Sequence, residues 1–437
     1  MRILFFPSDL GGGYGHFSRC IALAYEAMDR GHFCAFVLND NKFIGRVSSK
    51  FPVSVVKPWQ PLRRRILTLI SYLKNRKNSK TPLYVGFSGI EFQVIRDGFF
   101  SSRAIEHTLW GYKSAVQKFK PDVLVGDTNL LVWMLSGIVG IPAVQIVRYA
   151  THPETANLVW WRDMPEGISP PDTVKIFNPL LKRLGLNAIG SGKDLLRGDL
   201  YIVPSTPDIE PVPQGLSDTS HVGALLMRAD LNTVNPAVGF SEQGMPLIYV
   251  TIGGGAGSVG NLKLFSSIVS AMGDYPAQVI ISTGGKFDLK NIPCLPTNIR
   301  VFDWLPGGRI ISMADLVIFH GGYGTMMETV AAAKPSIIIP FHAEQESNGR
   351  RLEQLGCARI LKLSKEPYSS VKIKEPWGEY SYVVQRSYDL TDEELVEAVV
   401  AIIYGREFSE AAKKLQHTVR EYGGAEFAME LIESRFG

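Results

Sequence analysis

The sequence contains few cysteines, and their spacing does not suit a metal site or a disulfide framework. Of its 437 residues four are cysteines, and no two of them form a CxxC pair. This distribution argues against a zinc ribbon and against a small disulfide-stapled domain, and it favours reduced thiols. A DxD pair and an HExxH motif are also absent from the sequence. We therefore predict a protein without a metal site.

Long apolar runs are missing as well. No run approaches the roughly 18 residues that a membrane-spanning helix requires. The chain opens on Arg2–Pro7, which reads as a buried strand, and shows no charged leader with a cleavage site. Together with the reduced thiols, these features predict a cytoplasmic protein.

Acidic residues are absent from one window of the chain. Positions 41–90 contain no Asp or Glu but 11 Lys and Arg, while the whole chain carries 46 basic and 42 acidic residues. Because the positive charge is local, binding to nucleic acid is not predicted. Within residues 62–80, apolar side chains recur near helical spacing. Three interpretations stay open: a solvated helix packed on the first domain, a peripheral contact with anionic membrane at the inner face, or a subsite for an anionic acceptor.

What the sequence does contain is a repeated alternation of strand and helix patterns. Apolar runs of four to six residues end in glycine-rich or polar turns and are followed by amphipathic segments. This order indicates an α/β fold with parallel sheets. We predict an N-terminal domain over 1–215, a linker over 216–245, a second domain over 246–405, and a C-terminal helix over 406–437 that crosses back to the first domain.

A glycine-rich turn in the second half has the features of a phosphate-binding loop. The run Leu316–Phe319 reads as a strand and is followed by His320, three glycines and a helix expected to begin near Thr325. Glycine lets the backbone approach a ligand, and the first turn of a helix offers unpaired N–H groups to an anion. Glu328 either caps this helix or accepts hydrogen bonds from a sugar diol.

A second polar pair follows the next strand candidate, Ser336–Ile339. Glu344 and Gln345 lie just beyond its end, at the sheet edge that also carries His320. A carboxylate beside a carboxamide suits the recognition of hydroxyl groups.

The pattern His320-Gly-Gly-Tyr-Gly-Thr-x-x-Glu328, followed by Glu344-Gln345, resembles the donor-binding signature of the UDP-glycosyltransferases. The resemblance covers most of residues 246–362, and the 24 positions from His320 to Glu344 match the family spacing. It implies GT-B architecture, with two Rossmann-like domains facing an interdomain cleft. It also implies a nucleotide-sugar donor and no further cofactor. UDP is favoured because Glu328 suits a ribose diol, but dTDP users can carry the same residue, so the choice between UDP and dTDP stays open.

The resemblance also assigns roles within the donor site. His320 and Thr325 would contact the diphosphate, Glu328 the ribose, and Glu344 and Gln345 the transferred sugar. Trp304 would lie near the base, with backbone groups of Leu305 in place of a glutamine amide, because Gly307 stands where plant members have Gln. The donor-binding prediction comprises Gly254, Trp304, Leu305, His320, Gly322, Gly324, Thr325, Glu328, Glu344 and Gln345.

The first half carries a candidate general base. The run Gly11-Gly-Gly-Tyr-Gly-His16 is similar to that of the transferases that add N-acetylglucosamine to the lipid-linked peptidoglycan precursor, and Gly15-His-Phe-Ser-Arg19 resembles bacterial and archaeal members. The resemblance implies that His16 is the base, which a weakly nucleophilic sugar hydroxyl needs. Asp127 matches the partner position. We predict a His16–Asp127 dyad; the alternative is that both side chains cap helices.

These features and the resemblance predict a metal-independent glycosyltransferase that acts on a hydroxyl of a small molecule, a natural product or a lipid-linked compound. The resemblance implies inversion at the anomeric carbon. Gly13, Tyr14, Arg148 and His152 are predicted to contact the acceptor. Two rival functions share the fold: a nucleotide-sugar 2-epimerase and a binding protein that has lost catalysis. No pattern in the sequence indicates an oligomeric state.

Overall fold

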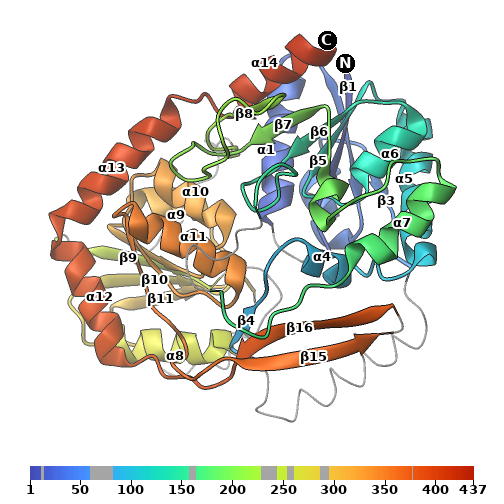
Figure 1. Cartoon of the computed structure of the whole chain (residues 1–437). Helices are drawn as coiled ribbons and strands as arrows, with labels where there is room; N and C mark the ends of the chain where they lie inside the picture. Colours follow the sequence, from blue (N-terminus) through green and yellow to red (C-terminus); the bar gives the residue numbers. More distant parts are fainter. Residues whose placement is uncertain are drawn as a thin grey trace.

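The computed structural model describes residues 1–10, 14–59, 82–156, 164–227, 244–252, 260–285, 295–375 and 377–437. In these residues the backbone forms two parallel sheets flanked by helices and one small antiparallel sheet (Figure 1).

The first sheet has the strand order β3-β2-β1-β5-β6-β7-β8, and all its neighbouring strands are parallel. Along β1, Ile3 and Phe5 pack on one face while Leu4 and Phe6 pack on the other, as expected for a strand that is covered on both sides. The strands are β1 Arg2–Pro7, β2 Phe33–Leu38, β3 Val53–Val55, β5 Val123–Asp127, β6 Ala143–Ile146, β7 Leu200–Val203 and β8 Thr219–His221.

Helices cover both faces of this sheet. Side chains of α5, α6 and α7 share one core cluster, and α1 shares the other with the last helix of the chain. The helices of this half are α1 Gly15–Asp29, η1 Asn41–Phe43, α2 Ile44–Val47, α4 Glu91–Arg96, α5 Ser102–Phe119, α6 Val132–Val139, α7 Thr173–Arg183 and η2 Gly192–Leu196.

The second sheet has the order β11-β10-β9-β12-β13-β14 and is also parallel. Its strands are β9 Leu247–Thr251, β10 Gln278–Ser282, β11 Ile299–Phe302, β12 Leu316–Phe319, β13 Ser336–Ile338 and β14 Ala358–Ile360. Its helices are α8 Gly260–Met272, α9 Gly307–Met313, α10 Tyr323–Ala331 and α11 Ala343–Gln354. The two predicted Rossmann-like halves are thus present.

Part of the predicted linker belongs to the first sheet. Strand β8 lies within 216–245 yet pairs with β7 as the sheet's last strand. Its three residues are half-buried and polar, so composition alone suggested a loop. Residues 228–243 lie outside the described part of the chain.

The C-terminal segment differs from the prediction of one helix over 406–437. Two helices lie in this range, α13 Arg406–Arg420 and α14 Ala425–Phe436, and they follow α12 Asp392–Tyr404. The break before α14 falls at Gly423 and Gly424, whose φ angles are 73° and 61° and therefore left-handed. In Figure 1, α12 and α13 run along the outside of the second sheet, and α14 reaches the first. There Arg30 and His32 bond to Glu433 at 2.9 and 2.7 Å.

A hairpin absent from the predictions joins the two halves. Strands β15 Ser369–Glu375 and β16 Gly378–Gln385 are antiparallel, and β16 also pairs with β4 Tyr84–Gly86 from the first half. The backbone N–H of Val85 donates to Phe341 O at 3.0 Å, which ties β4 to the end of the second sheet as well. The hairpin is seen at the bottom of Figure 1.

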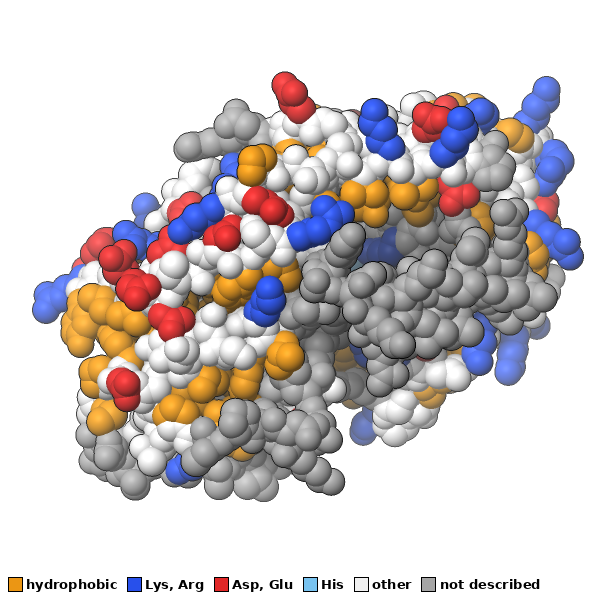
Figure 2. Space-filling model, turned by 90° about the horizontal axis from the view of Figure 1, so that it is seen from below, with side chains coloured by type: hydrophobic (Ala, Val, Ile, Leu, Met, Phe, Trp, Pro, Cys, Tyr) orange, Lys and Arg blue, Asp and Glu red, His pale blue; other side chains and the backbone are white. Residues whose placement is uncertain are grey.

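The basic segment 62–80 lies outside the described residues, so its three interpretations stay predictions. On the face shown in Figure 2, acidic and basic side chains of the described residues are interspersed. Hydrophobic side chains gather on the left of this face, on the side where Figure 1 places α8 and α12.

Candidate functional site

The predicted dyad residues lie in contact. His16 is the second residue of α1 and Asp127 the last of β5, and His16 Nδ1 is 2.7 Å from Asp127 Oδ1. The sheet brings them together because β1, which precedes α1, pairs with β5 and places Pro7 opposite Asp127. His16 lies inside the helix and the N-cap residue Tyr14 makes no side-chain cap, so the capping alternative does not hold for His16.

Arg19 is the third member of this cluster. Its Nε and Nη2 donate to Oδ2 and Oδ1 of Asp127, each at 2.8 Å, and its Nη2 is 2.9 Å from His16 Nδ1. Asp127 is fully buried, and burial alone would raise its pKa. The charges of Arg19 and His16 outweigh burial and hold the pKa of Asp127 below its usual range. The carboxylate therefore stays ionised.

The start of α10 lies directly opposite the start of α1. A Cβ placed on Gly324 would be 3.6 Å from Gly15 Cα, and one on Gly15 would be 3.8 Å from Gly324 N. No side chain caps the N-terminus of α10 at Gly322. The N–H groups of this first turn, where Thr325 is the third helical residue, are thus placed beside the dyad and suit an anion.

At two positions before α10, neighbouring atoms leave no room for a side chain, so both positions require glycine. Gly321 has a φ of 87°, and a Cβ there would lie 2.5 Å from Gln345 O. A Cβ on Gly322 would lie 2.5 Å from His320 Nε2, so the imidazole folds over the turn at the helix start. His320 and Thr325, the two residues predicted to contact the diphosphate, therefore lie on either side of one turn. The helix begins at Tyr323, two residues earlier than predicted.

Tyr323 inserts between two arginines of the first half. Its ring centre lies 3.9 Å from the guanidinium carbon of Arg148 and 5.3 Å from that of Arg19. Its hydroxyl donates to Pro204 O at 3.0 Å. Cation–π contacts of this kind strengthen when they are desolvated, and Tyr323 is buried. The two halves are therefore packed against each other at this point.

Arg148, predicted to contact the acceptor, joins the two halves through its side chain. Its Nε donates to Glu210 at 2.7 Å, its Nη1 to Glu344 at 2.9 Å and its Nη2 to Asn348 at 2.5 Å. All three guanidinium nitrogens thus have protein partners. Asn348, in turn, donates to Gly321 O at 2.8 Å, which links Arg148 to the donor loop.

The predicted sugar-binding pair lies in the first turn of α11. The Glu344 side chain is half-exposed. Partial loss of water around the carboxylate would by itself raise its pKa, but the nearby positive groups outweigh this effect and lower the pKa of Glu344. These groups are Arg148, His342, His16 and Arg96. Gln345 Oε1 accepts a hydrogen bond from the Phe341 backbone at 2.8 Å, which leaves the amide nitrogen as the group that can face a ligand.

Glu328 lies in the middle of α10 and does not cap it, which excludes the capping interpretation. Its Oε2 is 3.2 Å from where a Cβ of Gly307 would lie, at the start of α9. Burial raises the pKa of Glu328 to about 7. The segment just before α9 contains Trp304, whose side chain is 58% exposed, and Leu305, which is buried. Glu328 thus lies beside the start of α9, which closely follows Trp304 and Leu305 in the chain.

Of the remaining predicted residues, His152 departs most from expectation. It is fully buried, its Nδ1 accepts from the Glu154 backbone at 3.1 Å, and its Nε2 is 3.0 Å from Thr219 Oγ1. Its ring faces the domain interior, out of reach of an acceptor in this structure. Tyr14 packs against Phe17 and Phe43 just before α1. Gly13 and Gly254 lie outside the described residues.

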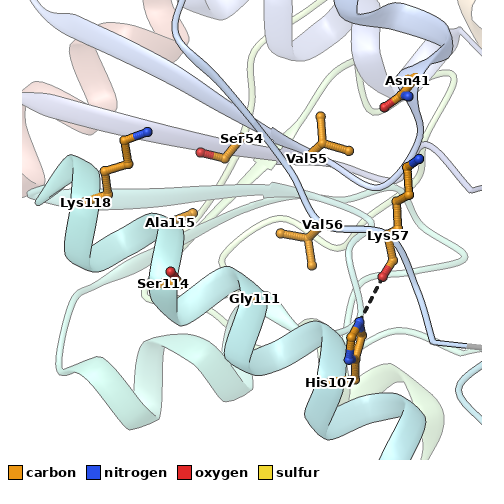
Figure 3. A pocket seen from close by; sticks show the side chains of 10 residues that line it. All are labelled: Asn41, Ser54, Val55, Val56, Lys57, His107, Gly111, Ser114, Ala115 and Lys118. Atoms are coloured by element: carbon orange, nitrogen blue, oxygen red, sulfur yellow. Dashed lines mark hydrogen bonds between the residues drawn. The ribbon is translucent and has the colours of Figure 1, made fainter.

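A cavity of about 660 Å³ opens elsewhere, between β3 and α5 (Figure 3). None of the predicted site residues lines it. Lys57 and Lys118 lie at separate sides of the view, and His107 Nε2 is 3.2 Å from Lys57 O. Its lining is Asn41, Ser54, Val55, Val56, Lys57, His107, Gly111, Ser114, Ala115 and Lys118.

Arg19, Tyr323 and Asn348 were not given roles from the sequence. A signal existed for Arg19, since it stands three residues after His16 in the Gly-His-x-Ser-Arg run and therefore on the same helix face. The positions of Tyr323 and Asn348 depend on how the two halves meet, which no local pattern encodes.

Comparison with known proteins finds similarity to glycosyltransferases. Residues 248–372 match the glycosyltransferase family 28 C-terminal domain. The chain is 25% identical over 340 residues to a PGL/p-HBAD biosynthesis glycosyltransferase of Mycobacterium tuberculosis, covering 72% of this chain and 71% of that protein. Its fold is similar to the glycosyltransferase of kitacinnamycin, with a TM-score of 0.69 at 18% identity over 100% and 98% of the chains. For the spinosyn rhamnosyltransferase SpnG the TM-score is 0.67 at 16% identity over 99% and 100%.

The fold is thus that of GT-B glycosyltransferases, with a glycosyltransferase family 28 C-terminal domain as its second half. The chain is similar to glycosyltransferases in its second half and in most of its sequence. Among the described residues, no helix has the length and apolar character needed to cross a membrane.

Proposed function

We propose that this protein transfers a sugar from a nucleoside diphosphate sugar, with UDP preferred, to an acceptor hydroxyl with inversion at the anomeric carbon. One observation carries the proposal: the His16–Asp127 pair of the first half lies beside the uncapped N-terminus of α10 in the second. A proton acceptor and an anion-binding helix start therefore meet at one place.

The proposed reaction is a single displacement. His16 Nδ1–H donates to Asp127 Oδ1, which leaves Nε2 to take the proton of the acceptor hydroxyl as its oxygen attacks the anomeric carbon. The ionised Asp127 stabilises the resulting imidazolium. Attack from the face opposite the leaving group inverts the configuration.

The leaving diphosphate takes the electron pair of the broken glycosidic bond. We place it at the first turn of α10, where backbone N–H groups and the positive end of the helix dipole stabilise the negative charge that develops. His320 and Thr325 flank that turn, Glu328 is placed for the ribose hydroxyls, and Glu344 and Gln345 for the sugar. This arrangement needs no metal ion.

The acceptor class is proposed from the relatives. The Mycobacterium tuberculosis protein is named for PGL/p-HBAD biosynthesis, and SpnG has been solved with a spinosyn aglycone. We propose a hydroxyl of a natural product or glycolipid as the acceptor of this chain. Contact of residues 62–80 with anionic membrane would suit a lipid-linked acceptor, and co-sedimentation with phosphatidylglycerol vesicles at low salt tests it.

The test begins with UDP and dTDP, compared by thermal shift, and continues with a panel of UDP- and dTDP-sugars and phenolic, macrolide and glycolipid acceptors. We expect transfer that survives EDTA and a product whose anomeric coupling shows inversion. His16→Ala and Asp127→Asn should each lower kcat by about 10²-fold or more, with folding unchanged by circular dichroism. Full turnover in His16→Ala would contradict the proposed base.

Incubation of the donor sugar without an acceptor distinguishes the proposed transferase from a 2-epimerase of the same fold. Formation of the 2-epimer, together with the absence of transfer across the panel, would favour that function over the one proposed.

A further inference from the structure

Arg19 is buried beside the dyad, where its side chain contacts Asp127, His16 and Tyr323. Its side chain is 6% exposed, and it grips Asp127 with two parallel N–H···O bonds of 2.8 Å. Such bidentate pairs fix the plane of a carboxylate as well as its charge. Arg19 therefore sets the orientation of Asp127 in the site.

This orientation decides which oxygen faces His16. Oδ2 is occupied by Arg19 Nε, while Oδ1 accepts from Arg19 Nη2 and lies 2.7 Å from His16 Nδ1. A carboxylate free to rotate would present either oxygen or turn away. With Arg19 in place, one oxygen is held toward the imidazole.

The imidazole has two possible tautomers here, and only one can act as base at Nε2. If Nδ1 carries the proton it donates to Asp127; if Nδ1 is bare it can accept from Arg19 Nη2 at 2.9 Å, and Nε2 is then blocked by its own proton. Arg19 Nη2 already has Asp127 Oδ1 as an acceptor at 2.8 Å and does not depend on the ring nitrogen, so the fixed carboxylate selects the productive tautomer.

The second half of the molecule completes this environment. Tyr323, the first residue of α10, lies with its ring 5.3 Å from the Arg19 guanidinium, and Gly15 and Gly324 permit the two helix starts to approach. The face of Arg19 turned toward the second half is thus covered by an aromatic ring. Contact between the two halves and the geometry of the dyad are linked through this side chain.

We propose that Arg19 is a positioning residue for sugar transfer: it holds Asp127 so that His16 carries its proton on Nδ1, and Tyr323 covers it when the donor-binding helix is in place. The kinetic part of this inference rests on the proposed function, whereas the tautomer part does not.

The kinetic experiment compares Arg19→Met, which keeps length but removes charge, with Arg19→Lys. We expect kcat to fall about 10- to 100-fold in Arg19→Met, with the donor KM within about threefold, and a smaller fall in Arg19→Lys. Arg30→Met is the matched control, because Arg30 lies at the other end of α1 and bonds to Glu26 and Glu433. Its kcat should stay within about twofold.

A double-mutant cycle of Arg19 and Asp127 distinguishes a positioning role of Arg19 from a general effect of its loss on the structure. In an Asp127→Asn background, Arg19→Met should lower kcat by less than about threefold, because its target is already gone. Equal losses in both backgrounds would overturn the proposal. Tyr323→Leu should lower kcat while Tyr323→Phe, which keeps the ring, should retain most of it.

Histidine ¹⁵N NMR of the full chain provides a readout without turnover. His16, assigned by comparison with His16→Gln, should show the Nδ1–H tautomer in the native protein and a mixture in Arg19→Met. An unchanged tautomer would overturn the proposal, even if Arg19→Met lowered kcat or could not be assayed. Failure of the native protein to transfer any sugar would count against the proposed function alone.

Discussion

Glu328 is the residue whose ionisation should be visible in donor binding. Burial against the start of α9 raises its pKa to about 7, from a usual value of 4.5. Between these two values the folded state binds a proton that the unfolded state has released, so this group's contribution to stability falls as pH rises. A ribose diol, which donates hydrogen bonds, prefers the ionised form.

Donor affinity should therefore increase as pH rises through about 7. We expect the Kd of UDP to improve about tenfold between pH 6 and pH 8 because of Glu328, and Glu328→Gln to lose this dependence. Isothermal titration calorimetry measures it. Since the terminal phosphate of UDP itself titrates near pH 6, the ratio of native to Glu328→Gln affinities isolates the carboxyl. A ratio that is constant with pH would contradict the assignment.

For single residues, local sequence patterns predict contacts between side chains on one helical turn or at the ends of adjacent strands. His16 and Asp127 follow neighbouring parallel strands, so their 2.7 Å contact follows from topology. Arg148 and His152 also follow a strand, but the first is bonded to Glu210 and Glu344, and the second is fully buried. Their partners Glu210, Glu344 and Thr219 are more than 60 residues away in the chain, which spacing along the sequence does not reveal.

The β15–β16 hairpin is the element that most departs from the prediction. Its strands alternate exposed and half-buried residues along much of their length, so they lack the apolar runs that identified the parallel strands. It crosses to the first half, where β16 pairs with β4 and Ser381 Oγ donates to Gly167 O at 2.7 Å. Strands β3 and β14 have only three residues each, too few to show a period of two.

Trp377, at the turn of this hairpin, should contribute to stability through the first half. Its ring stacks on Tyr380 with centres 5.7 Å apart and packs against the core cluster of α5, α6 and α7. We expect Trp377→Ala to lower the free energy of unfolding by about 2 kcal/mol, measured by urea denaturation. Lys374→Ala is the control: its ion pair with Glu379 is highly exposed, so less than about 0.5 kcal/mol should be lost.

At the scale of the whole molecule, the C-terminal helices hold the two halves from outside. Helix α13 contributes Ala412, Leu415 and Val419 to the core cluster of α9 and α10, and α14 contributes Ala428, Met429 and Ile432 to that of α1. The crossing back to the first half was expected from the family resemblance. The break between α13 and α14 was not, although the paired glycines at 423 and 424 signal it.

This arrangement makes α14 a stabiliser of the first half in particular. Ile432 is fully buried against α1, and Glu433 beside it bonds to Arg30 and His32. We expect Ile432→Ala to destabilise the protein by about 3 kcal/mol, whereas Glu426→Ala, an exposed change on the same helix, should have little effect. UDP affinity should be unchanged in both, because the donor residues lie on the second sheet. A urea transition that stays in place in Ile432→Ala, or a loss of UDP binding in the still-folded variant, would show that α14 does not act through the first half.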